Sequence, residues 1–220
     1  KNKEIIRPYS DNRLFKKIVL DNKVTALLVH DPSAFTSTAA ASMEVGSAFE
    51  SDLPGLAHFL EHMLFLGSKK YPTESSFEKY ITENSGGTNA FTNDVCTTYF
   101  FSISSKAFET ALDMFANFFS DALLSEDAVD REVNAVNSEY ENDLTSDGWR
   151  YQELMRRISS LSHPFHKFSI GNLKTLRDDP KLAGKSLHKE LKYFYDKYYS
   201  SHLLNVVVIG PQSIEALEKM

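Results

Sequence analysis

The chain contains very little cysteine, no long apolar run and no block of charge of one sign. One cysteine, Cys96, among 220 residues excludes an internal disulfide and fits a reducing compartment. No apolar segment approaches the ~20 residues that a membrane-spanning helix needs. The net charge of -6 is spread along the chain, which argues against a nucleic-acid partner. We therefore expect a globular protein with no membrane span and no nucleic-acid partner. We place it in the cytoplasm, with the mitochondrion as the alternative.

Both ends of the chain look cut from something longer. The chain begins at Lys1 rather than methionine, and it stops inside a helical pattern, 213–220, that has no terminating residue. The length suits one large domain with a core of its own. We expect residues 1–220 to be one domain of a longer multi-domain chain. The oligomeric state stays open, a homo-oligomer included.

Apolar periodicity predicts a mixture of strands and helices, which indicates an α+β fold. The expected strands are a hairpin within 16–30 and the segments 35–45, 88–92, 97–103 and 203–209. The expected helices cover 73–84, 107–124, 149–159 and 187–199, besides one around the motif described next. A further long helix starts at Ser125, and its apolar residues Val129, Val133, Val136, Tyr140 and Leu144 should form one buried stripe.

The stretch from His58 to Gly67 contains the pattern H-x-x-E-H inside an apolar run that follows Pro54. On a helix, positions i, i+3 and i+4 share one face, so His58, Glu61 and His62 should point the same way. Two imidazoles at this spacing suit a divalent metal, and a third protein ligand would leave one position for water. A carboxylate beside that water can act as its base.

The alternative to a metal site is a hydrogen-bonded cluster in the core. The helix is apolar almost all round and should be buried, so three ionisable groups on it carry a large desolvation cost unless something satisfies them. A metal ion does so and explains why both histidines and the glutamate occur together. We therefore favour the metal site.

The third ligand is not decided by spacing alone. Glu139 and Glu132 lie two helical turns apart on one border of the predicted stripe, and both are candidates, with Glu139 the better placed. His163 and His166 flank Pro164 in an expected loop and are weaker candidates. Cys96, at a turn, is by default an idle thiol.

Three strings together resemble a known family. They are the run 58–72, the run Gly86-Gly87-Thr88-Asn89-Ala90-Phe91-Thr92, and the run Asp130 to Glu139. Their order and extent resemble the insulysin branch, or insulin-degrading-enzyme group, of the pitrilysin-type zinc peptidases; H-x-x-E-H is the inverzincin signature. The resemblance implies a mostly antiparallel sheet packed against several helices. It also implies Zn²⁺ held by His58, His62 and Glu139, Glu61 as general base, and Glu132 as an acid that orients the ligands.

The resemblance further implies a zinc metalloendopeptidase domain at the N-terminal end of its chain, which hydrolyses small peptides through a metal-bound water. An extended peptide would add to the edge strand 88–92, with Asn89, Ala90 and Phe91 lining the cleft. The remaining domains of the full-length chain would enclose the substrate, so the isolated domain should be weakly active. Two alternatives stay open, a subunit like the mitochondrial processing peptidase and a non-catalytic scaffold member of the same fold.

Overall fold

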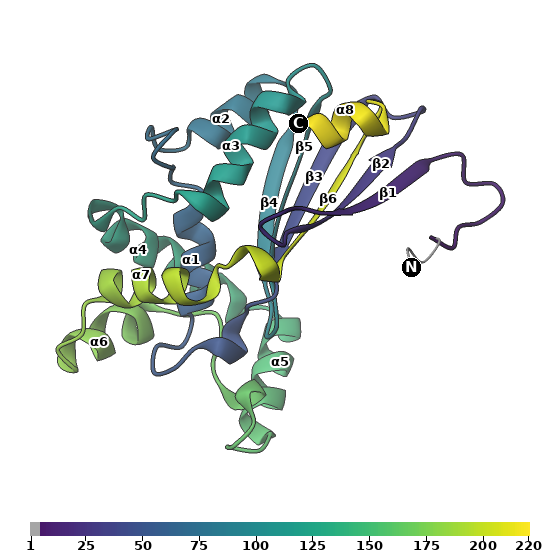
Figure 1. The fold of residues 1–220 in the computed structure, drawn as a ribbon. Coiled ribbons are helices and arrows are strands. Elements are labelled where there is room, and N and C mark those ends of the chain that lie inside the picture. Colours follow the sequence, from purple (N-terminus) through teal and green to yellow (C-terminus); the bar gives the residue numbers. More distant parts are fainter. Residues whose placement is uncertain (1–4) are drawn as a thin grey trace.

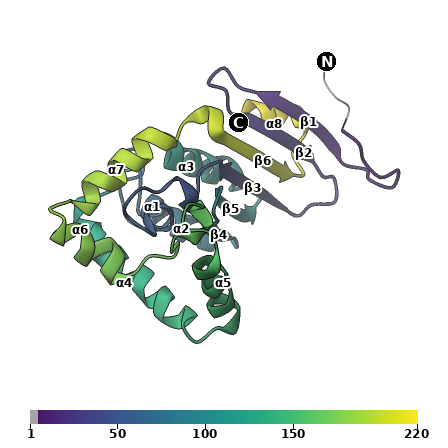
Figure 2. The ribbon, with the colours of Figure 1, turned by 90° about the horizontal axis from the view of Figure 1, so that it is seen from below.

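A six-stranded sheet with helices gathered mainly against one of its faces forms the protein (Figures 1 and 2). The computed structural model describes residues 5–220; Lys1 to Glu4, with which the predicted domain begins, lie outside the described residues. The strands are β1 Leu14–Val19, β2 Thr25–His30, β3 Thr36–Met43, β4 Gly87–Thr92, β5 Thr97–Ser104 and β6 Leu204–Gly210. The α-helices are α1 Leu56–Leu64, α2 Ser76–Glu83, α3 Phe108–Ser120, α4 Glu126–Asp143, α5 Asp147–Ile158, α6 Asp179–Leu182, α7 Leu187–Tyr198 and α8 Ile214–Lys219.

The strands follow the order β1-β2-β6-β3-β5-β4 across the sheet. Neighbouring strands run antiparallel except β2 and β6, which are parallel, so the expected α+β fold with a mostly antiparallel sheet is confirmed. The antiparallel hairpins join strands that are close in sequence, whereas β6 reaches the middle of the sheet from the far end of the chain. In the described part of the chain, β4 forms one edge of the sheet.

The helix-covered face of the sheet carries the core. Alternate residues of β3 and β5 are fully buried there, among them Ala39, Ala41 and Phe101. Small alanine side chains on β3 let the covering helices approach the sheet closely. The phenylalanines of α3 pack against this face, where Phe115 and Phe101 lie edge to face with ring centroids 5.1 Å apart. These aromatic residues belong to the core.

Helix α1 lies inside this helical layer. Seven of its nine residues are buried, as an almost uniformly apolar sequence predicts. Gly55 precedes the helix with a φ of 92°, a left-handed conformation that glycine adopts without strain. The helix ends at Leu64, before the motif run reaches Gly67.

Some details of the helices differ from the prediction. The buried stripe of α4 stops at Val136. Tyr140 is half-buried and packs edge to face on Phe168, and Leu144, just after the helix, is exposed. Helix α2 begins at Ser76, three residues after the expected start at Thr73. A π-helical turn, Lys174–Asp178, and α6 were not expected.

Within residues 5–220, no helix is both long and apolar enough to cross a membrane.

Candidate metal centre

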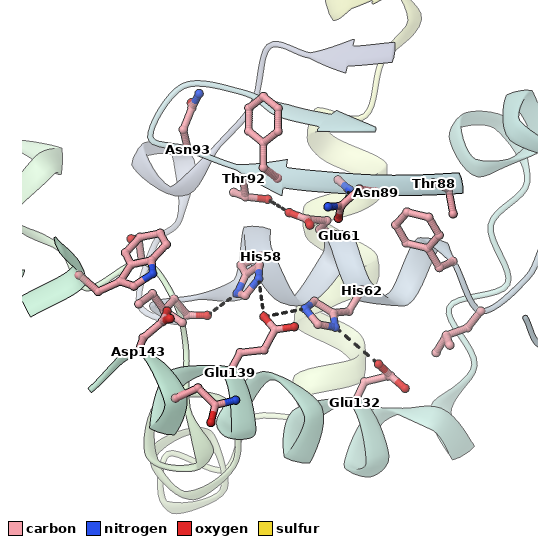
Figure 3. Close-up of a pocket in the computed structure, with 18 of the residues that line it drawn as sticks. His58, Glu61, His62, Thr88, Asn89, Thr92, Asn93, Glu132, Glu139 and Asp143 are labelled. Atoms are coloured by element: carbon pink, nitrogen blue, oxygen red, sulfur yellow. Dashed lines mark hydrogen bonds and ion pairs between the residues drawn. The ribbon is translucent and has the colours of Figure 1, made fainter. Parts of the chain in front are cut away.

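Helices α1 and α4 pack side by side and bring three ligand-type side chains to one point (Figure 3). Nε2 of His58 and Nε2 of His62 each lie 3.4 Å from Oε2 of Glu139. One potential ligand atom from each of the three residues lies within 4.8 Å of the other two. In the described residues no other group of three or more histidines, cysteines and carboxylates converges in this way.

The distances fit a tetrahedral zinc ion. Bonds of about 2.0–2.1 Å from zinc to nitrogen or oxygen place neighbouring tetrahedral ligands about 3.4 Å apart, which matches both measured contacts to Glu139. Two neutral imidazoles and one carboxylate are a typical ligand set for a catalytic zinc with one position left open. The Glu139 side chain is 52% exposed, and all three candidate ligands line the cleft.

Each histidine is also held through its second ring nitrogen. Nδ1 of His58 lies 2.7 Å from the carbonyl oxygen of Ile170, and Nδ1 of His62 lies 3.7 Å from Oε2 of Glu132. A carbonyl oxygen only accepts hydrogen bonds, so Nδ1 of His58 carries the proton and Nε2 presents its lone pair. Such outer partners fix the ring orientation of metal-binding histidines. Glu132 thus lies beside Nδ1 of His62, while Glu139 contacts Nε2 of both rings.

Glu61 lies in the same cavity and turns toward the sheet (Figure 3). Thr92 at the end of β4 donates its hydroxyl hydrogen to Oε2 of Glu61, with the two oxygens 2.5 Å apart. Glu61 is 7% exposed. The three motif side chains were expected to point the same way, but the histidines point toward α4 and the glutamate toward β4. This divergence leaves Glu61 outside the convergent ligand set.

Burial and charge act in opposite directions on these groups. Burial raises the pKa of Glu61, and the neighbouring His58, Thr92 and His62 reduce the rise. Burial lowers the pKa of His62, but the nearby carboxylates of Glu132 and Glu139 outweigh it and raise that pKa to about 9. The imidazoles of His58 and then His62 hold the pKa of Glu139 well below its usual range. Glu139 is thus a carboxylate ready to bind a cation.

The cleft beside these residues has a volume of about 870 Å³ and is bounded on one side by β4. Asn89, Ala90 and Phe91, the expected substrate-contacting residues, all line it, and Phe91 is 49% exposed. Trp149 and Gln152 of α5 line the cleft as well. The edge strand therefore opens directly onto the candidate metal centre.

The weaker ligand candidates lie outside the convergent group. Cys96 is at the β4–β5 turn, and His163 and His166 belong to a short 3₁₀ turn. Sequence reasoning missed the roles of Thr92 and of the Ile170 carbonyl. Thr92 stands in a string typical of the family, which could have drawn attention to it. A backbone carbonyl, by contrast, leaves no signal in a sequence.

The sequence pattern of the family described as Insulinase (Peptidase family M16) matches residues 25–160. The chain belongs to the M16 peptidase family. It is 45% identical over 218 residues to the peroxisomal insulin-degrading enzyme-like 1 of Arabidopsis thaliana, covering 99% of this chain and 22% of that protein. It is 41% identical over 217 residues to the human insulin-degrading enzyme, covering 98% of this chain and 21% of that protein. These relatives confirm the insulysin branch.

A solved structure supports the same assignment. The crystal structure of pitrilysin matches this M16 domain with a TM-score of 0.95 at 37% identity, over 100% of this chain and 23% of that chain. A protease from Helicobacter pylori shares the fold, with a TM-score of 0.81 at 24% identity, over 94% of this chain and 48% of that chain. The chain spans about a fifth of the length of the curated relatives it matches. The M16 peptidases are metallopeptidases, so a metal belongs to this family's chemistry.

Proposed function

We propose that this chain is the zinc-binding domain of a metalloendopeptidase. His58, His62 and Glu139 would hold Zn²⁺, and Glu61 would act as the general base. The observation that carries the proposal is the separation of roles in the site: two imidazole nitrogens meet one carboxylate at zinc-ligand distances, while a second carboxylate lies in the same cavity outside that set.

The residues of the chain have distinct tasks in this reaction. Zinc, when bound, supplies a Lewis acid that polarises the scissile carbonyl and makes a water acidic enough to attack near neutral pH. Glu61 accepts the proton of that water and returns it to the leaving amine. Burial raises the pKa of Glu61, which makes its carboxylate a stronger base toward that water. Glu132 keeps His62 oriented through Nδ1.

Peptides are the proposed substrates, bound as an added strand on β4. An edge strand offers backbone hydrogen bonds that any extended peptide can make, so the cleft would accept many sequences. Asn89, Ala90 and Phe91 would contact the side chains next to the scissile bond. The half-exposed Phe91 ring offers an apolar surface for one of them.

The rest of the longer protein belongs to the proposal too. Because the relatives are several times longer than this chain, we propose that further domains complete the substrate chamber and that residues 1–220 form its N-terminal domain. The isolated domain would then bind zinc but cleave peptides slowly. One free cysteine fits a cytoplasmic location, although one relative is named as peroxisomal.

The test combines metal analysis with peptide cleavage. The wild-type protein should hold one zinc per chain, measured by mass spectrometry of the metal, and should cleave an unstructured peptide. Glu61→Gln should keep the zinc and lose turnover, and Glu139→Ala should lose the zinc. Glu83→Gln on the exposed face of α2 is the matched control and should change neither property. Normal turnover in Glu61→Gln would contradict the assignment of the base.

A non-catalytic scaffold gives a different result. Such a protein would show no peptide cleavage, even in its full-length form and with zinc bound. The site argues for the enzyme, since all four functional positions carry side chains able to do the chemistry.

A further inference from the structure

The segment Ser169–Leu173 lies against the candidate metal centre although no sequence motif marks it. Its Ile170 carbonyl oxygen is 2.7 Å from Nδ1 of His58. Ser169 and Ile170 both line the cleft. This backbone contact joins His58 of α1 to a part of the chain 112 residues away. The placement of one carbonyl therefore decides how the His58 ring is held.

A close approach of two glycines makes this placement possible. Gly55, directly before α1, and Gly171 both have left-handed backbones, with φ of 92° and 88°. A Cβ atom on Gly55 would lie 2.2 Å from Cα of Gly171, and one on Gly171 would lie 2.8 Å from Cδ1 of the buried Leu176. A side chain at Gly55 therefore requires a shift of the backbone, and one at Gly171 would strain its left-handed backbone and come within 3.3 Å of Cα of Gly55. Such a shift would move the neighbouring Ile170 carbonyl.

The other side of the segment is tied to α4. Oδ1 of Asn137 accepts a hydrogen bond from the backbone N–H of Leu173 at 3.0 Å, and Nδ2 of Asn137 donates to Glu141 at 2.7 Å. The backbone N–H of Asn172 donates to the Thr175 hydroxyl, and the backbone N–H of Thr175 donates to Oδ1 of Asn172. The segment thus spans the two helices that carry the candidate ligands, held by the glycine contact at α1 and by Asn137 at α4.

We propose that Ser169–Leu173 is a positioning element for the metal centre, in which the Gly55–Gly171 contact and the Asn137 bond hold the Ile170 carbonyl where it fixes the ring and tautomer of His58. The proposal rests on the proposed zinc site. Its physical basis is that the proton on Nδ1 leaves Nε2 free to bind a metal, and that a partner of fixed position removes the rotational freedom of the ring. Gly171 and Asn137 are positioning residues, since neither contacts the ligand atoms.

The first test measures zinc affinity by competition with a chelator. Gly171→Ala and Asn137→Ala should each weaken zinc binding, by about 10–100-fold if they act as outer-shell partners usually do. Two matched controls accompany them. Gly184→Ala adds a Cβ at a positive φ of 67° where no atom lies within 4 Å. Asn134→Ala removes an exposed amide of α4 that bonds within its own helix. Both controls should bind zinc like the wild type.

The second test determines which nitrogen of His58 carries the proton in the metal-free protein, by nitrogen NMR at a pH where the ring is neutral. The wild type should show the proton on Nδ1, with the signal assigned by its loss in His58→Gln. Asn137→Ala should move population toward the Nε2–H tautomer, whereas a purely structural loss of stability would leave the tautomer unchanged. If Gly171→Ala fails to fold, Asn137→Ala decides the question. Unchanged zinc affinity and tautomer in a folded Asn137→Ala would overturn the proposal. A wild type that binds no zinc would instead refute the proposed function, and the tautomer result would still stand by itself.

Discussion

Replacing Glu50 with alanine is expected to lower the free energy of unfolding by about 2–6 kcal/mol. Glu50 is only 2% exposed, and its two carboxylate oxygens accept the backbone N–H groups of Gly55 at 2.9 Å and Ala57 at 2.8 Å. These donors belong to the start of α1, where N–H groups have no acceptor within the helix. A buried donor left unpaired costs about 1–3 kcal/mol, and alanine leaves two. Since domains are stable by about 5–15 kcal/mol, the loss is large.

The assay is a urea titration followed by far-ultraviolet circular dichroism, with the slope of the transition checked for two-state behaviour. Glu83→Ala is the matched control, because that carboxylate is exposed and pairs only with Lys79 at 3.9 Å; its effect should stay within about 0.5 kcal/mol. An unchanged midpoint in Glu50→Ala would refute the reasoning that the buried Glu50 carboxyl group stabilises the start of the helix bearing the candidate metal ligands.

Three further predictions concern pH, the base and the metal. Burial raises the pKa of Glu50 to about 8 in the folded protein, so the folded state holds the proton more tightly than the unfolded state. The stabilisation from this group should be fully present below the unfolded pKa near 4.5. It should decrease as pH rises toward 8, by at most about 1.4 kcal/mol per pH unit. The urea midpoint of the wild type should therefore decrease over this pH range, whereas that of Glu50→Gln should not. Thr92→Val removes the hydroxyl that holds Glu61 and should reduce kcat about tenfold, with KM nearly unchanged and Thr92→Ser close to wild type in steady-state kinetics. Removing zinc with a chelator should lower the melting temperature, because zinc at 100 times its Kd contributes about 2.7 kcal/mol; Glu139→Ala should not respond.

The sequence predicted those parts of the fold that depend on local pattern. Strand and helix positions followed from apolar periodicity, and α1 was identified from its motif. The parallel pairing of β2 with β6 joins segments about 180 residues apart, so no local sequence pattern predicts it. The π-helical turn Lys174–Asp178 was also missed, because a change in helical hydrogen bonding leaves little trace in residue type.

The candidate site was predicted in its residue types and only partly in its geometry. Spacing placed Glu132 and Glu139 on one border of α4, but it did not say which would face the histidines. That choice depends on how far α4 is shifted along its axis relative to α1, which tertiary packing determines. Spacing also implied one direction for the motif side chains, whereas Glu61 turns to β4 because Thr92 offers it a hydrogen bond there.

The site is therefore a property of three separate segments rather than of the motif. Helix α1 supplies two imidazoles and a base, α4 supplies the carboxylate that contacts both rings, and the Ile170 carbonyl holds one ring from behind. A helix with H-x-x-E-H alone would leave both rings free to rotate and three ionisable groups to be solvated. Burial of α1 is stable only when α4 and the segment Ser169–Leu173 supply polar partners for those groups. The same contacts that stabilise the fold at this point thus fix the ligands, and we expect mutations at Glu50, Asn137 and Gly171 to reduce stability and zinc affinity together.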